Sequence, residues 1–327
     1  MIRKLTAALL AASFVTAGLA GTAQAKSSIR FATLAPKQSP WGKVFTAWQK
    51  AVEDKTKGEV EVQWLWNGTA GPENNMVGKI KSGQITGAAI TAVGLSAIHK
   101  PIIALQMPGA FKSWAELDKA RDALRPEFDK AMTEAGFYVS GWGDVGSART
   151  MSNGFDVKVP DDLKGKTPGL LAQDIISPKV FEAIGGITAK PADVVEFLPL
   201  LNSGAINVLT APSLAAEQLQ WTSRLDHIND GLVGFGVGAM VISDKELSKL
   251  PKDQRDIMET TGKAAQLALL KIIRKEDDLS FERLQKKMTT HHETDAEKAE
   301  WEKIYKKACQ RVKTAMPGDV LAKIGYC

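Results

Sequence analysis

Residues 29–90 read IRFATLAPKQSPWGKVFTAWQKAVEDKTKGEVEVQWLWNGTAGPENNMVGKIKSGQITGAAI, and this stretch decides the fold class. Residues 29–34 form a short strand pattern, and residues 41–54 place apolar side chains at helical spacing. Residues 59–66 then alternate as a strand does, a further helix opens at Pro72, and a buried strand closes the stretch. Strands that alternate with helices at this interval predict an α/β fold.

The alternation continues beyond residue 90. Residues 115–135 predict a helix, and residues 137–142 and 149–152 predict two separate strands. Residues 232–243 are apolar and rich in glycine, but their glycine spacing fits neither G-x-G-x-x-G nor a P-loop. We therefore expect a strand that crosses between two parts of the protein. From residue 252 onward the pattern is mainly helical.

The N-terminus has the layout of a secretory signal peptide. Arg3 and Lys4 precede a mostly apolar stretch over residues 5–20, and an A-x-A tripeptide ends at Ala25. We expect cleavage after Ala25 and an exported product. The alternative is a membrane anchor, but the apolar run is interrupted by polar residues and falls short of the ~20 residues that span a bilayer. About 300 residues then remain, which favours two lobes over one hydrophobic core.

The cysteines and the net charge further restrict the class of protein to which this chain can belong. An exported protein sits in an oxidising compartment, so we expect Cys309 and Cys327 to form a disulfide that ties the C-terminus to the preceding helix. The formal net charge is +5 before the leader is removed, and no Lys/Arg cluster is interleaved with aromatic residues. We therefore expect no nucleic-acid partner.

Residues for catalysis or metal binding do not gather in the sequence. There is no G-x-S-x-G motif, and the neighbouring His291 and His292 cannot share one helix face. We expect no metal site, no cofactor and no enzymatic activity. An exported hydrolase with dispersed catalytic groups is the alternative.

Three tryptophans are candidate ligand contacts. Trp66, Trp142 and Trp221 lie near predicted strand ends or loops, where α/β proteins place their ligands. The alternative for each of them is ordinary packing in a hydrophobic core.

Several motifs follow one another in a specific order along the chain. They are Gly71-Pro72-Glu73, KSGQI at 81–85, MPGAF at 107–111, PDDLKGK at 160–166, FEAIGG at 181–186 and EFLPLLNSGAIN at 196–207. Each motif is weak alone, but the ordered set resembles the substrate-binding proteins of tripartite ATP-independent periplasmic (TRAP) transporters.

This resemblance implies an α/β, two-lobed periplasmic binding protein, a "flytrap", with a mixed sheet flanked by helices in each lobe and a helical C-terminal part. We expect lobe I to hold residues 26–147 and about 236–275, and lobe II to hold residues 148–235 and about 276–327. The implied function is capture of a small organic solute in the periplasm and delivery to an inner-membrane TRAP permease, by a protein that we expect to be a monomer. The alternative is a ligand sensor that presents its closed form to a membrane signalling receptor.

The resemblance also implies binding residues, and the departures from the pattern are informative. Gly169 stands where the family commonly has an Arg that clamps a ligand carboxylate, and Ala211 stands where an Asn is common. Arg149 matches a second basic position, with a salt bridge inside one lobe as its alternative role, and Glu73 belongs to a matched motif. Because glycine cannot replace the two charge-assisted hydrogen bonds of a guanidinium, we expect a neutral, aromatic or weakly polar ligand.

Overall fold

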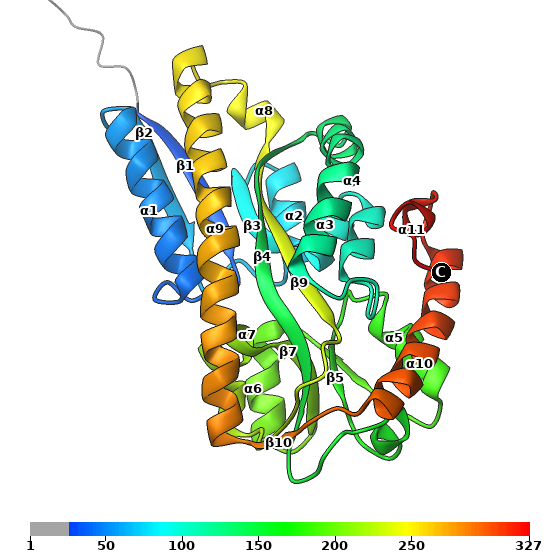
Figure 1. Cartoon of the computed structure of the whole chain (residues 1–327). Coiled ribbons are helices and arrows are strands. Elements are labelled where there is room, and N and C mark those ends of the chain that lie inside the picture. Colours follow the sequence, from blue (N-terminus) through cyan, green and yellow to red (C-terminus); the bar gives the residue numbers. More distant parts are fainter. Residues whose placement is uncertain (1–25) are drawn as a thin grey trace, which may run out of the picture.

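The computed structural model describes residues 26–327, so the leader predicted over residues 1–25 lies outside the described residues. The chain folds into a mixed α/β structure whose main sheet is covered by helices on both faces (Figure 1). The strands are β1 (Ser27–Thr33), β2 (Val60–Leu65), β3 (Gly87–Thr91), β4 (Phe137–Ser152), β5 (Gly169–Leu171), β6 (Lys190–Ala192), β7 (Val208–Pro212), β8 (His227–Asn229), β9 (Gly234–Ser243) and β10 (Thr289–His291). The α-helices are α1 (Pro40–Lys55), α2 (Glu73–Lys81), α3 (Ala92–Ser96), α4 (Trp114–Glu134), α5 (Ser177–Ile184), α6 (Val194–Asn202), α7 (Ser213–Gln218), α8 (Asp244–Leu247), α9 (Lys252–Lys287), α10 (Asp295–Ala315) and α11 (Val320–Lys323). Short 3-10 segments are η1 (Lys100–Gln106), η2 (Pro160–Leu163) and η3 (Trp221–Ser223).

The main sheet runs through the whole molecule. Its strand order is β10-β8-β4-β9-β3-β1-β2, and β7 also pairs with β4. The strands β1, β2 and β3 are parallel, whereas β9 is antiparallel to both β3 and β4. The predicted mixed sheet with flanking helices is confirmed, and β4 and β9 make it continuous between the two predicted lobes.

The prediction of two strands within residues 137–152 is wrong, because β4 is one 16-residue strand. Its pairing with β9 shifts register between Val139 and Gly141 and again between Asp144 and Gly146. These irregularities interrupt the alternation of apolar and polar residues, which is why the sequence pattern breaks into two pieces. Beyond them, the last residues of β4 pair with β7 and β8.

The glycine-rich segment predicted as a crossover strand is β9. It starts beside the distal end of β4 and ends against β3. A Cβ atom at Gly238 would lie 2.5 Å from the carbonyl oxygen of Ile90, so the close approach of β9 to β3 requires glycine at this position.

Helix α9, 36 residues long, braces this sheet along its length (Figure 1). At one point a Cβ atom on Gly262 would lie 2.6 Å from the Ser140 carbonyl oxygen, so the helix and β4 touch through their backbones. Further along, the buried carboxylate of Asp277 accepts hydrogen bonds from the backbone N–H groups of Ser147 (2.7 Å) and Leu214 (2.9 Å). Asp277 thereby fixes α9 to both β4 and α7.

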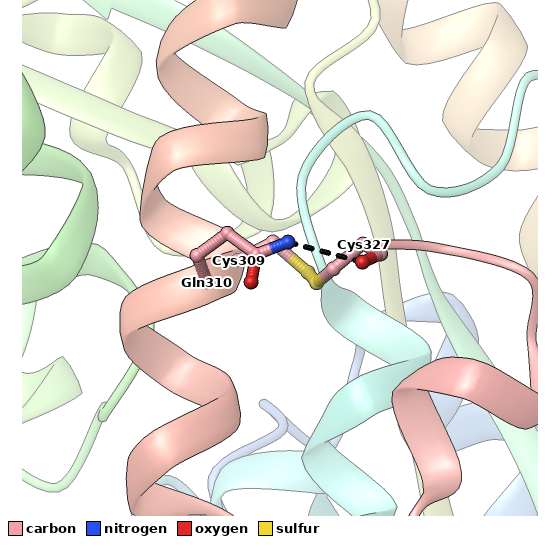
Figure 2. Close-up of a disulfide and its surroundings, with 3 residues drawn as sticks. All are labelled: Cys309, Gln310 and Cys327. Atoms are coloured by element: carbon pink, nitrogen blue, oxygen red, sulfur yellow. Dashed lines mark hydrogen bonds between the residues drawn. A yellow bond between two sulfur atoms is a disulfide. The ribbon is translucent and has the colours of Figure 1, made fainter.

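The C-terminal segment is held by a disulfide, as predicted. Cys309 of α10 and Cys327 are bonded, with their Cα atoms 5.9 Å apart, and Gln310 Nε2 donates to the Cys327 carbonyl oxygen at 3.0 Å (Figure 2). The helical C-terminal part therefore ends in a closed loop.

The C-terminal helices contact segments of both predicted lobes. Helix α10 packs against α5. Its Glu302 pairs with Lys112 at 2.6 Å, and Lys323 of α11 pairs with Glu127 of α4 at 2.7 Å. Residues 276–327, predicted to belong to lobe II, therefore do not pack on lobe II alone, and the lobe boundaries stay a prediction. Within residues 26–327, no helix has the length and apolar character needed to span a membrane.

Candidate functional site

A cavity of about 330 Å³ lies between segments of the two predicted lobes. Strands β1, β3, β4 and β9 contribute to its wall from the side of lobe I, and β5, β7 and α5 contribute from the side of lobe II. Its volume falls at the lower end of the ~300–1,000 Å³ that small-molecule sites occupy.

The wall of the cavity is predominantly apolar and rich in aromatic rings. The aromatic residues that line it are Trp41, Phe45, Phe181, Phe197, Trp221, Phe235, Trp301 and Tyr305. Much of the polar wall is already engaged: Thr150 and Thr210 hydroxyls share a hydrogen bond at 3.2 Å, and Trp41 Nε1 donates to the Asp144 carbonyl oxygen at 3.1 Å. Such a wall favours a solute with a large apolar or aromatic surface.

The charged groups of the wall are acidic. Among the described residues that line the cavity, none is Lys, Arg or His, whereas Glu73, Asp144 and Asp174 are present. Asp144 is compensated from outside the wall, because its buried carboxylate pairs with Arg121 at 2.7 Å and with Arg274 at 2.6 Å. No cation of this wall is therefore available to a bound anion.

Glu73 opens α2 and reaches the start of α3. Its Oε1 accepts from the Thr91 N–H at 2.7 Å, and its Oε2 accepts from Thr91 Oγ1 at 2.6 Å and from the Gly94 N–H at 3.0 Å. Burial raises the pKa of Glu73, although these hydrogen bonds act in the opposite direction. The residue lines the cavity, as predicted for a site residue, and it also holds the β3–α3 connection in place.

Asp174 is the corresponding acid on the side of lobe II. It accepts hydrogen bonds from the Ser177 hydroxyl and from the Ile176 N–H, the latter at 2.7 Å, and so caps the start of α5. Burial raises the pKa of Asp174 against the effect of these hydrogen bonds.

Three further residues predicted for the site also line the cavity: Gly169, Ala211 and Trp221. A Cβ atom at Gly169 would lie 2.8 Å from both Ile206 Cδ1 and Leu209 Cδ2, so aliphatic side chains occupy the space next to this glycine. Trp221 is 5% exposed and meets the Phe197 ring edge-to-face at 5.3 Å.

Arg149 is not among the residues that line the cavity. Its strand neighbours Ala148 and Thr150 do line it, and alternation along β4 directs Arg149 to the opposite face of the sheet. There its guanidinium lies 3.6 Å from the ring centre of Phe281, and its Nη1 donates to the Ser147 carbonyl oxygen at 3.3 Å. Arg149 therefore stacks on an aromatic ring of α9, in place of the salt bridge that the sequence left open as its alternative role.

Trp66 and Trp142 also lie outside the cavity wall. Trp66 stacks on Trp64, two residues earlier, with ring centres 5.1 Å apart. Trp142 is 1% exposed, and its Nε1 donates to Asp129 of α4 at 3.2 Å. Trp142 is buried in the core and Trp66 is partly buried against it, so both take the packing role that the sequence left open as an alternative.

Some cavity residues were not singled out by the sequence. The sequence pattern of Trp41 and Phe45 indicates only the buried face of a helix, yet both side chains line the cavity. Trp301 and Tyr305 are spaced i, i+4 on α10, and this aromatic pair just after a helix start was the available signal. No group of His, Cys, Asp and Glu side chains suited to a metal ion occurs among residues 26–327.

The family of the chain follows from comparison with known proteins. The family described as bacterial extracellular solute-binding protein, family 7, matches residues 31–314. A solute-binding protein of Chromohalobacter salexigens is 25% identical over 202 residues, which are 62% of this chain but only 59% of that relative.

Solved structures show the same fold. A TRAP periplasmic solute-binding protein from Sulfurospirillum deleyianum, with bound succinate, has a TM-score of 0.85 at 18% identity, covering 92% of this chain and 99% of its own. One from Chromohalobacter salexigens, with bound D-glucuronate, has a TM-score of 0.83 at 17% identity, covering 91% and 98%. The two-lobed fold, the cavity between the lobes and the family match over most of the sequence agree: this chain belongs to family 7 of the bacterial extracellular solute-binding proteins.

Proposed function

We propose that this protein is the periplasmic receptor of a TRAP-type transporter whose solute is neutral, aromatic or weakly polar and is not held through a carboxylate. The observation that carries this proposal is the cavity wall, which combines aromatic and aliphatic side chains with acids and contains no Lys or Arg among the described residues.

The physical reason is the cost of burying a charge. A carboxylate that leaves water for a closed cleft must regain its hydrogen bonds and a compensating charge, and an unpaired buried charge costs several kcal/mol. Glu73 and Asp174 would add repulsion in this cavity. An apolar or aromatic solute has no such cost and gains ~25 cal/mol for each Å² of apolar surface removed from water.

Succinate and D-glucuronate are the ligands of the two solved proteins described above, and both molecules carry carboxylates. At 17–18% identity these proteins share the fold with this chain, and the wall composition decides the solute.

The proposed mechanism is reversible capture. A solute between the lobes contacts both of them, so it stabilises the closed form relative to the open one. The closed monomer then meets the permease in the inner membrane and releases its solute there, with no bond broken. The signal-peptide layout of residues 1–25 supports export to the periplasm and cleavage after Ala25.

The experiment is a calorimetric comparison of solute classes with ligand-free protein. We expect micromolar or tighter binding for at least one neutral or aromatic compound and none for succinate or D-glucuronate up to millimolar concentration. Tight binding of either acid, with no response to uncharged compounds, would refute the proposed solute class.

A further inference from the structure

A second, smaller pocket of about 100 Å³ adjoins the solute cavity. Thr150, Val233, Trp301 and Tyr305 line both of them, so one face of the cavity is also a wall of this pocket. The remaining wall of the small pocket is much more polar than that of the cavity and includes charged side chains of α10 and of the segment before it.

Glu293 is positioned firmly in this pocket. Its backbone N–H donates to Asp230 Oδ1 at 2.8 Å. Its carboxylate lies flat against Gly231, since a Cβ atom at that glycine would be 2.5 Å from Oε1 and 2.7 Å from Oε2. Among the described residues, no hydrogen bond reaches either carboxylate oxygen, although the side chain is half-buried.

Several other polar side chains of the pocket are already engaged, whereas Lys298 Nζ and the Tyr305 hydroxyl have no hydrogen-bond partner among the described residues. Asn229 donates to the Val157 carbonyl oxygen at 2.8 Å and accepts from the Gly231 N–H at 2.7 Å. Glu302 is paired with Lys112 at 2.6 Å. Glu293 therefore offers two acceptor oxygens that the described part of the chain does not use.

The surroundings of Glu293 favour a cationic partner. Burial raises the pKa of this carboxyl group, the charges of Lys298 and His291 oppose that shift, and those of Asp230 and Glu297 reinforce it. Lys298 also lines the pocket, and its side chain is exposed to solvent. Across the shared wall, the cavity adds Glu73 and Asp174 and no Lys or Arg.

We propose that the solute carries a hydrogen-bond-donating nitrogen, an amine, and that Glu293 in the second pocket holds this group while the apolar body of the solute fills the main cavity. This inference rests on the proposed function, because it identifies the chemical group that forms the polar end of a weakly polar solute. The amine would donate to the free carboxylate oxygens next to Trp301 and Tyr305, and the ion pair would be partly shielded from water.

The test uses three probes that differ only in their end group: 3-phenylpropylamine, 3-phenylpropan-1-ol and 3-phenylpropanoate. Calorimetry with the ligand-free protein should show the amine binding at least about tenfold more tightly than the alcohol, as one charge-assisted hydrogen bond would provide. Glu293→Gln should remove this preference, so that the variant binds the amine and the alcohol with similar affinity. Glu300→Gln, an exposed acid on α10 outside both pockets, is the matched control and should retain the preference.

The thermal unfolding of Glu293→Gln is measured alongside. A folding defect would lower the unfolding temperature and weaken the binding of the amine and the alcohol together. Any result in which the amine fails to bind more tightly than the alcohol overturns the assignment of Glu293, and so does an unchanged preference in the variant. If the alcohol still binds better than the acid, the proposed solute class survives that failure. If the acid binds best of the three, the proposed function fails as well.

Discussion

Replacing Glu73 tests how the cavity wall is built. Its carboxylate is 5% exposed and accepts three hydrogen bonds from Thr91 and Gly94. In Glu73→Gln the amide NH₂ group must face at least one N–H donor, which is left without an acceptor at a cost of about 1–3 kcal/mol. Because the variant no longer buries a charge, part of this cost is offset, and we expect a net loss near 1 kcal/mol at neutral pH. Glu73→Ala leaves all three donors without a partner and opens space beside α3, so we expect a loss of about 3–5 kcal/mol.

Urea unfolding of both variants measures these differences, with Glu300→Gln as the control at an exposed position. The pH dependence provides an independent check. Since burial raises the pKa of Glu73 above its ordinary value of 4.5, the native state holds this proton more tightly than the unfolded chain. The contribution of Glu73 to stability should therefore fall as the pH rises from 4.5 through the raised pKa, and Glu73→Gln should lack that fall. A loss above 3 kcal/mol in Glu73→Gln at neutral pH would mean that the buried charge stabilises the fold, which contradicts the raised pKa.

Three further predictions concern other parts of the fold. Replacing Cys309 and Cys327 by Ser opens a loop with a sequence separation of 18, and we expect up to ~3 kcal/mol of lost stability in urea unfolding; an unchanged midpoint would show that the bridge does not constrain the unfolded chain. Arg149→Ala should change solute affinity less than twofold while lowering stability by about 1–2 kcal/mol through the lost ring stack, and a large loss of affinity would restore its predicted role in binding. Arg274→Met leaves the buried Asp144 with one cationic partner in place of two, so we expect about 2–3 kcal/mol of destabilisation in thermal or urea unfolding, and a neutral result would mean that Arg121 alone suffices.

The sequence predicted the fold where local patterns are strong. The structure contains the helix predicted over residues 115–135, the glycine-rich crossover strand and the disulfide. Each has a local signal in the sequence: helical periodicity, closely spaced glycines, and two cysteines in a chain with an export signal. The strand over residues 137–152 was divided in two because its bulges break the alternation that identifies a strand. Continuity of the sheet between the lobes depends on long-range pairing, which no local pattern contains.

The binding site was predictable only in part. Gly169, Ala211 and Trp221 line the cavity, but whether they contact solute remains a prediction. The role of Arg149 depends on which face of β4 its side chain occupies, and a register shift earlier in the strand sets that face. Its position in the sequence alone could therefore not decide whether the side chain points to the cavity or to α9. Trp142 was ambiguous for a different reason: the predicted strand ended at this residue, and a strand-end position fits both a ligand contact and a core contact.

Aromatic residues of the wall that come from distant helices were the hardest to find. Trp41 and Phe45 precede Trp301 by more than 250 residues, and these side chains line one cavity only because distant segments of the chain pack together. The amphipathic pattern of each helix explains its buried face but does not say that the face borders a cavity.

The chemical identity of the bound solute tests the central claim most directly. The exported protein would be purified without denaturation, and any retained small molecule would be identified by mass spectrometry of the native complex and of the extracted ligand. The account predicts an aromatic or weakly polar molecule that carries no carboxylate. A dicarboxylate or a sugar acid in the cavity would contradict it, because the described wall offers such a ligand no cation.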